Sequence, residues 1–96
     1  MQKLKIIVSG RVQGVGFRYF VISVAREHSI FGRVWNNDDG TVGIWAQSEN
    51  SAEMTAFLAS VRQGPKRSPF AKVDYLDSLP AAFPDFTDFN ITYDTH

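Results

Sequence analysis

With 96 residues, no cysteine and a formal net charge of zero at pH 7, the sequence excludes several classes of protein. The length predicts a single domain over residues 1–96, and the lack of cysteine rules out disulfides, thiolate metal sites and cysteine nucleophiles, which suits a reducing cytoplasm. The balanced charge gives no indication of binding to nucleic acid or to an anionic membrane, and no apolar run is long enough to span a bilayer.

The chain begins with a predicted β-strand. Leu4, Ile6 and Val8 alternate with polar residues, which is the period of a strand with one buried face. Lys3 and Lys5 interrupt the short apolar run, so the N-terminus does not have the pattern of a signal peptide.

Three glycines follow the strand within seven residues, at Gly10, Gly14 and Gly16. Glycine suits backbone at positive φ and allows a ligand to approach the main chain closely. A strand-to-helix turn of this kind directs free N–H groups into a concavity at the positive end of the helix, where phosphate binds. Arg18 falls in the first helical turn, where its guanidinium can grip two phosphate oxygens. A plain tight turn is the alternative interpretation.

Two better-known phosphate-binding loops are excluded. The nucleotide-binding loop requires Gly-x4-Gly-Lys-Ser/Thr, and no Lys-Ser or Lys-Thr follows these glycines. The dinucleotide fingerprint requires a third glycine where this chain has Tyr19.

An amphipathic helix is predicted next, because apolar residues recur at helical spacing. These residues are Phe17, Phe20, Val21, Val24 and Ala25. The helix is expected to end between His28 and Ile30. We expect His28 to be half-exposed near the negative end of the helix, which favours a histidine there without any catalytic role.

Two strands are predicted at residues 31–37 and 41–47. Asp38-Asp39-Gly40 between them indicates a hairpin turn, since Asp and Gly suit the positive φ of such turns. Neighbouring aspartates with no third ligand nearby are typical of turns rather than of metal sites.

A second helix is predicted to begin after Asn50, with Glu53 three residues on, and to end at Gly64-Pro65. Its apolar stripe is Met54, Phe57, Leu58 and Val61. The segment Lys66-Arg67-Ser68 is expected to be an exposed basic loop, with a patch for a partner as the alternative.

Strands at residues 71–76 and 89–93 complete the chain, with Pro80 and Pro84 in a stiff connection between them. The resulting order, β-α-β-β-α-β plus a C-terminal strand, predicts an α+β fold of the ferredoxin-like type. In this sandwich, two helices cover one face of an antiparallel sheet. Because this fold supports many activities, it does not by itself establish the function.

Two segments resemble the signatures of the acylphosphatase family. Gly10-Arg11-Val12-Gln13-Gly14-Val15-Gly16-Phe17-Arg18 resembles the first, and Gly32 to Val42 resembles the second. Phe89 to Tyr93 is similar to the family's terminal strand. The chain departs from the family at Arg33, where an aromatic residue is usual. Asn37 directly follows the signature residue Asn36, so either asparagine remains open as the functional one.

The resemblance implies hydrolysis of an acyl phosphate to a carboxylate and inorganic phosphate, by direct attack of water. It implies no metal, no cofactor and no covalent intermediate. It assigns phosphate binding to Arg18 with the loop amides, and orientation of the water to Asn36. The implied phosphate-binding residues are Gln13, Gly14, Val15, Gly16, Phe17 and Arg18. It also implies a cytoplasmic monomer, with inorganic phosphate as both product and competitive inhibitor.

The chemistry of these residue types agrees with that assignment. An acyl phosphate is a mixed anhydride whose leaving group is a stable carboxylate, so no strong general acid is needed. Phosphoryl transfer depends mostly on positioning and charge stabilisation, which an amide cradle and one arginine can supply. Asparagine can hold a water through both donor and acceptor atoms while adding no charge.

Two alternatives come from other functional classes. One is a non-catalytic acylphosphatase-like module, since related domains stand at the front of larger carbamoyl-transfer maturation proteins. The lack of a following Cys-x-x-Cys zinc segment favours the stand-alone enzyme. The other is an RNA-binding ferredoxin-like domain, but the strand at 41–47 lacks the paired aromatic residues that stack on bases.

Overall fold

The computed structural model of the chain describes residues 1–93 and contains the predicted order of strands and helices. Each element lies within a few residues of its expected position. The elements are β1 (Gln2–Arg11), α1 (Phe17–Glu27), β2 (Phe31–Asn36), β3 (Val42–Ser48), α2 (Ser51–Gln63), β4 (Lys72–Pro80) and β5 (Phe89–Ile91).

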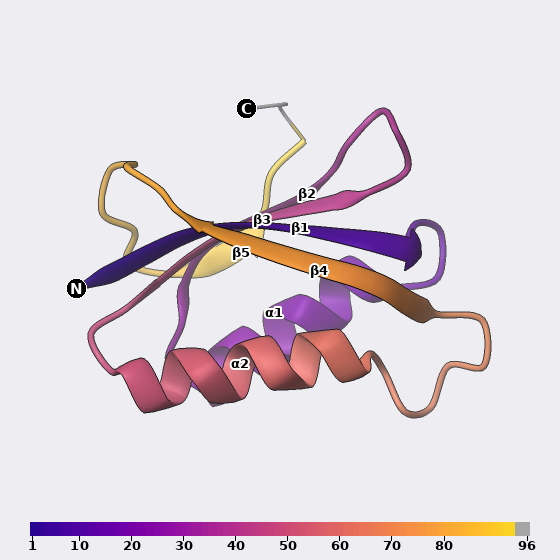
Figure 1. The fold of residues 1–96 in the computed structure, drawn as a ribbon, viewed down its shortest axis with the longest axis horizontal. Helices are drawn as coiled ribbons and strands as arrows, with labels where there is room; N and C mark the ends of the chain where they lie inside the picture. The colour runs from indigo at the N-terminus through magenta and orange to yellow at the C-terminus, as the bar shows by residue number, and fades with distance from the viewer. Residues whose placement is uncertain (94–96) are drawn as a thin grey trace.

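The strands form one sheet in the order β4-β1-β3-β2-β5, with both helices against the same face (Figure 1). This is the expected ferredoxin-like arrangement. The pairs β1–β3, β1–β4 and β2–β3 are antiparallel, whereas β5 pairs with β2 in parallel. The sheet is therefore mixed rather than antiparallel throughout, because the chain crosses over the sheet before β5 begins.

The core lies between the helices and the sheet, and the predicted periodicities describe it well. Leu4, Ile6 and Val8 are buried on β1, in agreement with the strand pattern. The helical stripes are also buried, although Phe20 and Leu58 lie at the margin and are only partly covered. The buried helical residues of these stripes are Phe17, Val21, Val24, Ala25, Met54, Phe57 and Val61.

Aromatic side chains cover part of the opposite face of the sheet. Phe83, from the connection between β4 and β5, stacks on Trp45 with ring centroids 5.2 Å apart. Trp35 packs edge-on against Trp45 and is almost completely buried. Trp35 lies over Gly43, where an added Cβ would meet its ring at 2.4 Å. Glycine at this position therefore leaves the space that the indole occupies.

Local signals at the ends of α2 act as expected. The Asn50 side chain accepts a hydrogen bond from the Glu53 amide at 3.0 Å and so caps the helix, and Gly64 ends it with φ of 79°. His28 follows the last residue of α1, half-buried, with its Nδ1 atom 2.9 Å from Glu53 Oε2. It thus joins the end of α1 to the start of α2, which is a structural position.

The β2–β3 turn also has the predicted chemistry. Gly40 has a φ of 91°, and Asp39 accepts hydrogen bonds from the hydroxyl and the amide of Thr41 at 2.7 and 3.0 Å. These two bonds lower the pKa of the Asp39 carboxyl. Asp39 therefore stabilises the turn. No group of three or more His, Cys, Asp or Glu side chains among residues 1–93 could hold a metal ion.

Two strands differ in length from the expectation. β4 extends to Pro80, well past the predicted end at residue 76, because β1 offers partner positions as far back as Leu4. As β4 is an edge strand, the missing N–H of Pro80 costs no sheet hydrogen bond. β5 ends at Ile91 rather than at residue 93, although the Thr92 amide still donates to the Val34 carbonyl at 2.9 Å. No helix in the described part of the chain is long and apolar enough to cross a membrane.

Candidate functional site

The glycine loop, residues 12–16, connects β1 to α1 and has the backbone that its sequence predicts. Gly14 and Gly16 have φ values of 72° and 75°, in the left-handed region. A Cβ at either position would meet nothing within 4 Å. The conformation of the backbone, and not crowding, is therefore what requires glycine at these two positions.

The end of α1 next to this loop has unpaired donors. Gly16 occupies the N-cap position without a side-chain cap, and the first turn contains no acidic residue. Along the chain from Gly14, the first backbone amide with a described acceptor is that of Phe20, which donates to the Gly16 carbonyl at 3.1 Å. Within residues 1–93, the amides of residues 14–19 make no hydrogen bond. These N–H groups and the positive end of the helix favour an anion.

Arg18 stands on the first turn of α1 and is partly exposed. Its guanidinium carbon lies 5.6 Å from the centre of the Tyr93 ring, a cation–π contact. The ion pairs among the described residues involve Lys3, His28, Arg33 and Lys72, so Arg18 has no carboxylate partner there. Its charge is thus available to an anionic ligand.

The two neighbouring asparagines have different surroundings. Asn37 Oδ1 accepts a hydrogen bond from the Trp35 indole at 2.8 Å, and its Nδ2 donates to Thr41 Oγ1 at 3.0 Å. Asn36 Oδ1 is buried and has no hydrogen-bond partner within the described residues. A buried oxygen left unpaired costs about 1 to 3 kcal/mol, so this acceptor has hydrogen-bonding capacity that the described residues do not use. Asn36 therefore has the free acceptor, whereas Asn37 is engaged in the hairpin.

The glycine loop and the β2–β3 hairpin lie at the same end of the molecule (Figure 1). The Gln13 side chain joins them, because its Nε2 donates to the carbonyls of Asn37 and Thr41 at 2.8 and 2.9 Å. Its side-chain nitrogen is thus directed to the hairpin and not into the loop. This contact was missed in the sequence, where Gln13 is only one residue of the loop.

The remaining residues expected to bind phosphate offer their backbone. Phe17 is almost completely buried in the core, and Val15 packs partly against it. Their side chains support the loop, while their amides have no acceptor within residues 1–93. Arg18 is therefore the one member of the expected set with a charged side chain, and the others would contribute N–H groups.

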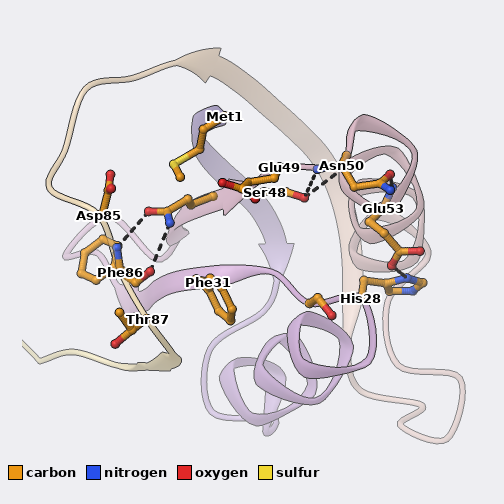
Figure 2. A pocket seen from close by; sticks show the side chains of 12 residues that line it. Met1, His28, Phe31, Ser48, Glu49, Asn50, Glu53, Asp85, Phe86 and Thr87 are labelled. Atoms are coloured by element: carbon orange, nitrogen blue, oxygen red, sulfur yellow. Dashed lines mark hydrogen bonds and ion pairs between the residues drawn. The ribbon is translucent and has the colours of Figure 1, made fainter.

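The structure also contains a cavity of about 560 Å³, and Figure 2 shows the side chains that line it. Its lining includes Met1, Phe31 and Ser48, from the start of β1, the start of β2 and the end of β3. The glycine loop and Asn36 lie at the opposite ends of β1 and β2. None of the residues expected to bind phosphate or water lines this cavity. The candidate site is thus distinct from this cavity.

The sequence matches the family model of acylphosphatase over residues 4–91. An acylphosphatase from Lactococcus lactis is 64% identical over 98 residues, which cover 97% of this chain and 100% of that protein. An acylphosphatase from Ligilactobacillus salivarius is 45% identical, again over 97% of this chain and its own full length.

Solved structures have the same fold. The crystal structure of acylphosphatase from Bacillus subtilis superimposes with a TM-score of 0.88 at 39% identity, covering 97% of this chain and 100% of that one. A crystal structure of full-length HypF in a phosphate- and nucleotide-bound form matches with a TM-score of 0.78 at 29% identity, over 95% of this chain but 12% of that protein. Since the family model spans most of the sequence and relatives match along their full length, the chain belongs to the acylphosphatase family.

Proposed function

We propose that this acylphosphatase hydrolyses acyl phosphates by direct attack of water on phosphorus. In this mechanism the amides of the glycine loop and Arg18 bind the phosphate, and Asn36 orients the water. The observation that carries the proposal is the buried Oδ1 of Asn36, which is unpaired within residues 1–93. It lies at the same end of the sheet as a helix terminus whose amides have no acceptor in that part of the chain (Figure 1).

The phosphate is held by groups of complementary charge. The free N–H groups near Gly14 and Gly16 donate to phosphoryl oxygens, and the positive end of α1 adds to the attraction. Arg18 supplies the full positive charge and can donate two parallel hydrogen bonds. These donors are already in place before substrate binds, so they need little reorganisation as charge moves during the reaction.

Asn36 acts on the attacking water. Its Oδ1 accepts a hydrogen bond from the water, which turns an oxygen lone pair toward phosphorus. The side chain is neutral, so it does not repel the negatively charged phosphoryl group. This role uses the atom that has no hydrogen-bond partner among residues 1–93.

The leaving group needs no help from a general acid. The oxygen of water forms a bond to phosphorus while the bond from phosphorus to the acyl oxygen breaks, and the carboxylate leaves with the bonding electrons. Both protons of the water remain on the phosphate, so an acyl phosphate dianion and water give a carboxylate and dihydrogen phosphate. Positioning and charge stabilisation are therefore sufficient.

The reaction is expected to proceed without a metal ion, since the proposed groups neutralise the phosphate by themselves. Turnover of benzoyl phosphate should be unchanged after dialysis against EDTA and in EDTA-containing buffer. Phosphate monoesters, which have a poorer leaving group, should be hydrolysed far more slowly. Loss of activity on chelation that a divalent ion restores would contradict the mechanism.

Replacement of the two asparagines should separate their roles. Asn36→Ala should lower kcat by about two orders of magnitude or more and leave inhibition by phosphate nearly unchanged, because the lost contact acts mainly in the transition state. Asn37→Ala should mainly destabilise the hairpin, by about 1 kcal/mol for each lost hydrogen bond, and lower kcat much less. If steady-state kinetics gave the larger fall in kcat for Asn37→Ala, we would assign the orientation of the water to Asn37.

Arg18→Lys should weaken catalysis although it keeps the charge, because lysine lacks the two-pronged donor. Loss of about 2 to 4 kcal/mol of transition-state binding corresponds to a fall of about 30- to 1,000-fold in kcat/KM. Competitive inhibition by inorganic phosphate should weaken in parallel. Arg62→Lys, on the exposed side of α2, is the matched control and should change neither quantity. A folded Arg18→Lys protein with normal turnover and normal phosphate inhibition would place the phosphate site elsewhere.

A further inference from the structure

We propose that the Gln13 side chain is a positioning residue that holds Asn36 in register with the phosphate-binding amides. This inference rests on the proposed function, since it concerns how the two halves of that site are kept together. In this positioning role, the Gln13 side chain contacts neither the phosphate nor the water. It acts through the hairpin that begins directly after Asn36.

The geometry of the contact is well determined by its partners. Gln13 Nε2 lies 2.8 Å from the Asn37 carbonyl oxygen and 2.9 Å from the Thr41 carbonyl oxygen. Since both partners are acceptors, the atom that faces them is the amide nitrogen and not the amide oxygen. Both N–H groups of the side chain are therefore used on the base of the hairpin.

The hairpin does not need Gln13 to complete its own hydrogen bonds. The Asn37 carbonyl also accepts from the Gly40 amide at 3.2 Å, and the Thr41 carbonyl accepts from the Asn37 amide at 2.9 Å. Removal of the Gln13 side chain thus leaves neither carbonyl unpaired. This argues that the link orients the hairpin relative to the loop and is not required to form it.

The segment around Asn36 is held on both sides. Before it, Trp35 is buried against Gly43 and Trp45. After it, Asn37 is bonded to the Trp35 indole through its side chain and to Gln13 through its carbonyl. The Gln13 side chain links this segment to the glycine loop, because Gln13 is itself a residue of that loop, directly before Gly14. A displacement of about 1 Å between reacting groups can cost about 100-fold in rate, so such a link matters for catalysis.

The test is Gln13→Met, which keeps the length of the side chain and removes both donors. We expect kcat on benzoyl phosphate to fall by about 10- to 100-fold. Inhibition by inorganic phosphate should change by less than about 3-fold, because the Gln13 amide and the loop remain. Gln13→Asn, which keeps the donors but is one methylene shorter, provides a second variant should the methionine variant fold poorly, and the same fall in kcat is expected.

Gln47→Met is the matched control. Gln47 also makes two hydrogen bonds to backbone, at the other end of the sheet: its Nε2 donates to the Phe86 carbonyl at 3.1 Å, and its Oε1 accepts from the Phe86 amide at 2.9 Å. The Gln47→Met substitution should lower Tm by about 4 to 8 °C for each 1 kcal/mol of unfolding free energy that is lost, and it should leave kcat unchanged. A merely structural role for Gln13 would give the same pattern, and that result would overturn the proposal.

A double-mutant cycle with Asn36→Ala tests whether Gln13 acts through Asn36. We expect Gln13→Met to lower kcat by less than about 3-fold when Asn36 is already alanine, since the water is then no longer held. A full additional loss would overturn the proposal while leaving the proposed function intact. Weakened phosphate inhibition in Gln13→Met would also overturn it, as the side chain would then serve the phosphate. Normal activity of Asn36→Ala alone would contradict the proposed function itself, and the Gln13 role with it.

Discussion

The site depends on one constraint of the backbone, the positive φ of Gly14 and Gly16 at the uncapped end of α1. This conformation leaves the amides of residues 14–19 without acceptors among the described residues. Most proteins satisfy such donors with a capping side chain or with water. In the proposed mechanism these donors bind the ligand, and the buried Phe17 fixes the helix that presents them. Phosphate binding would then be a property of the main chain, to which Arg18 adds charge.

The second half of the site depends on packing at the opposite face of the sheet. Gly43 leaves room for Trp35, whose indole donates to Asn37 Oδ1, whereas Asn36 Oδ1 has no hydrogen-bond partner among residues 1–93. Because a phosphoryl group needs donors and one cation rather than an enclosed apolar pocket, the site can remain open. The cavity between Met1, Phe31 and Phe86 is at the other end of β1 and β2, and none of the proposed site residues lines it.

Much of the fold could be predicted from local patterns. The spacing of Phe17, Val21 and Val24, the Asn50 cap and the Asp39-Gly40 turn each act over a few residues and are confirmed. Long-range features could not be predicted in this way. The parallel pairing of β5 depends on its partner β2, and the extension of β4 to Pro80 depends on its partner β1. The residues of β4 are mostly exposed, so they do not alternate in a way that shows where this edge strand ends.

The residues of the candidate site show the same difference between local and long-range features. The glycine spacing and Arg18 are local signals, whereas the different surroundings of Asn36 and Asn37 depend on Trp35, in the same strand as Asn36, and on Thr41, across the hairpin. The most direct test of the central claim is a titration of the uniformly ¹⁵N-labelled protein with inorganic phosphate, followed by amide chemical shifts. The largest saturable shifts should fall on residues 14–18, with an apparent Kd equal to the inhibition constant of phosphate. Saturable shifts elsewhere, with the loop amides unmoved at inhibitory phosphate, would contradict the account.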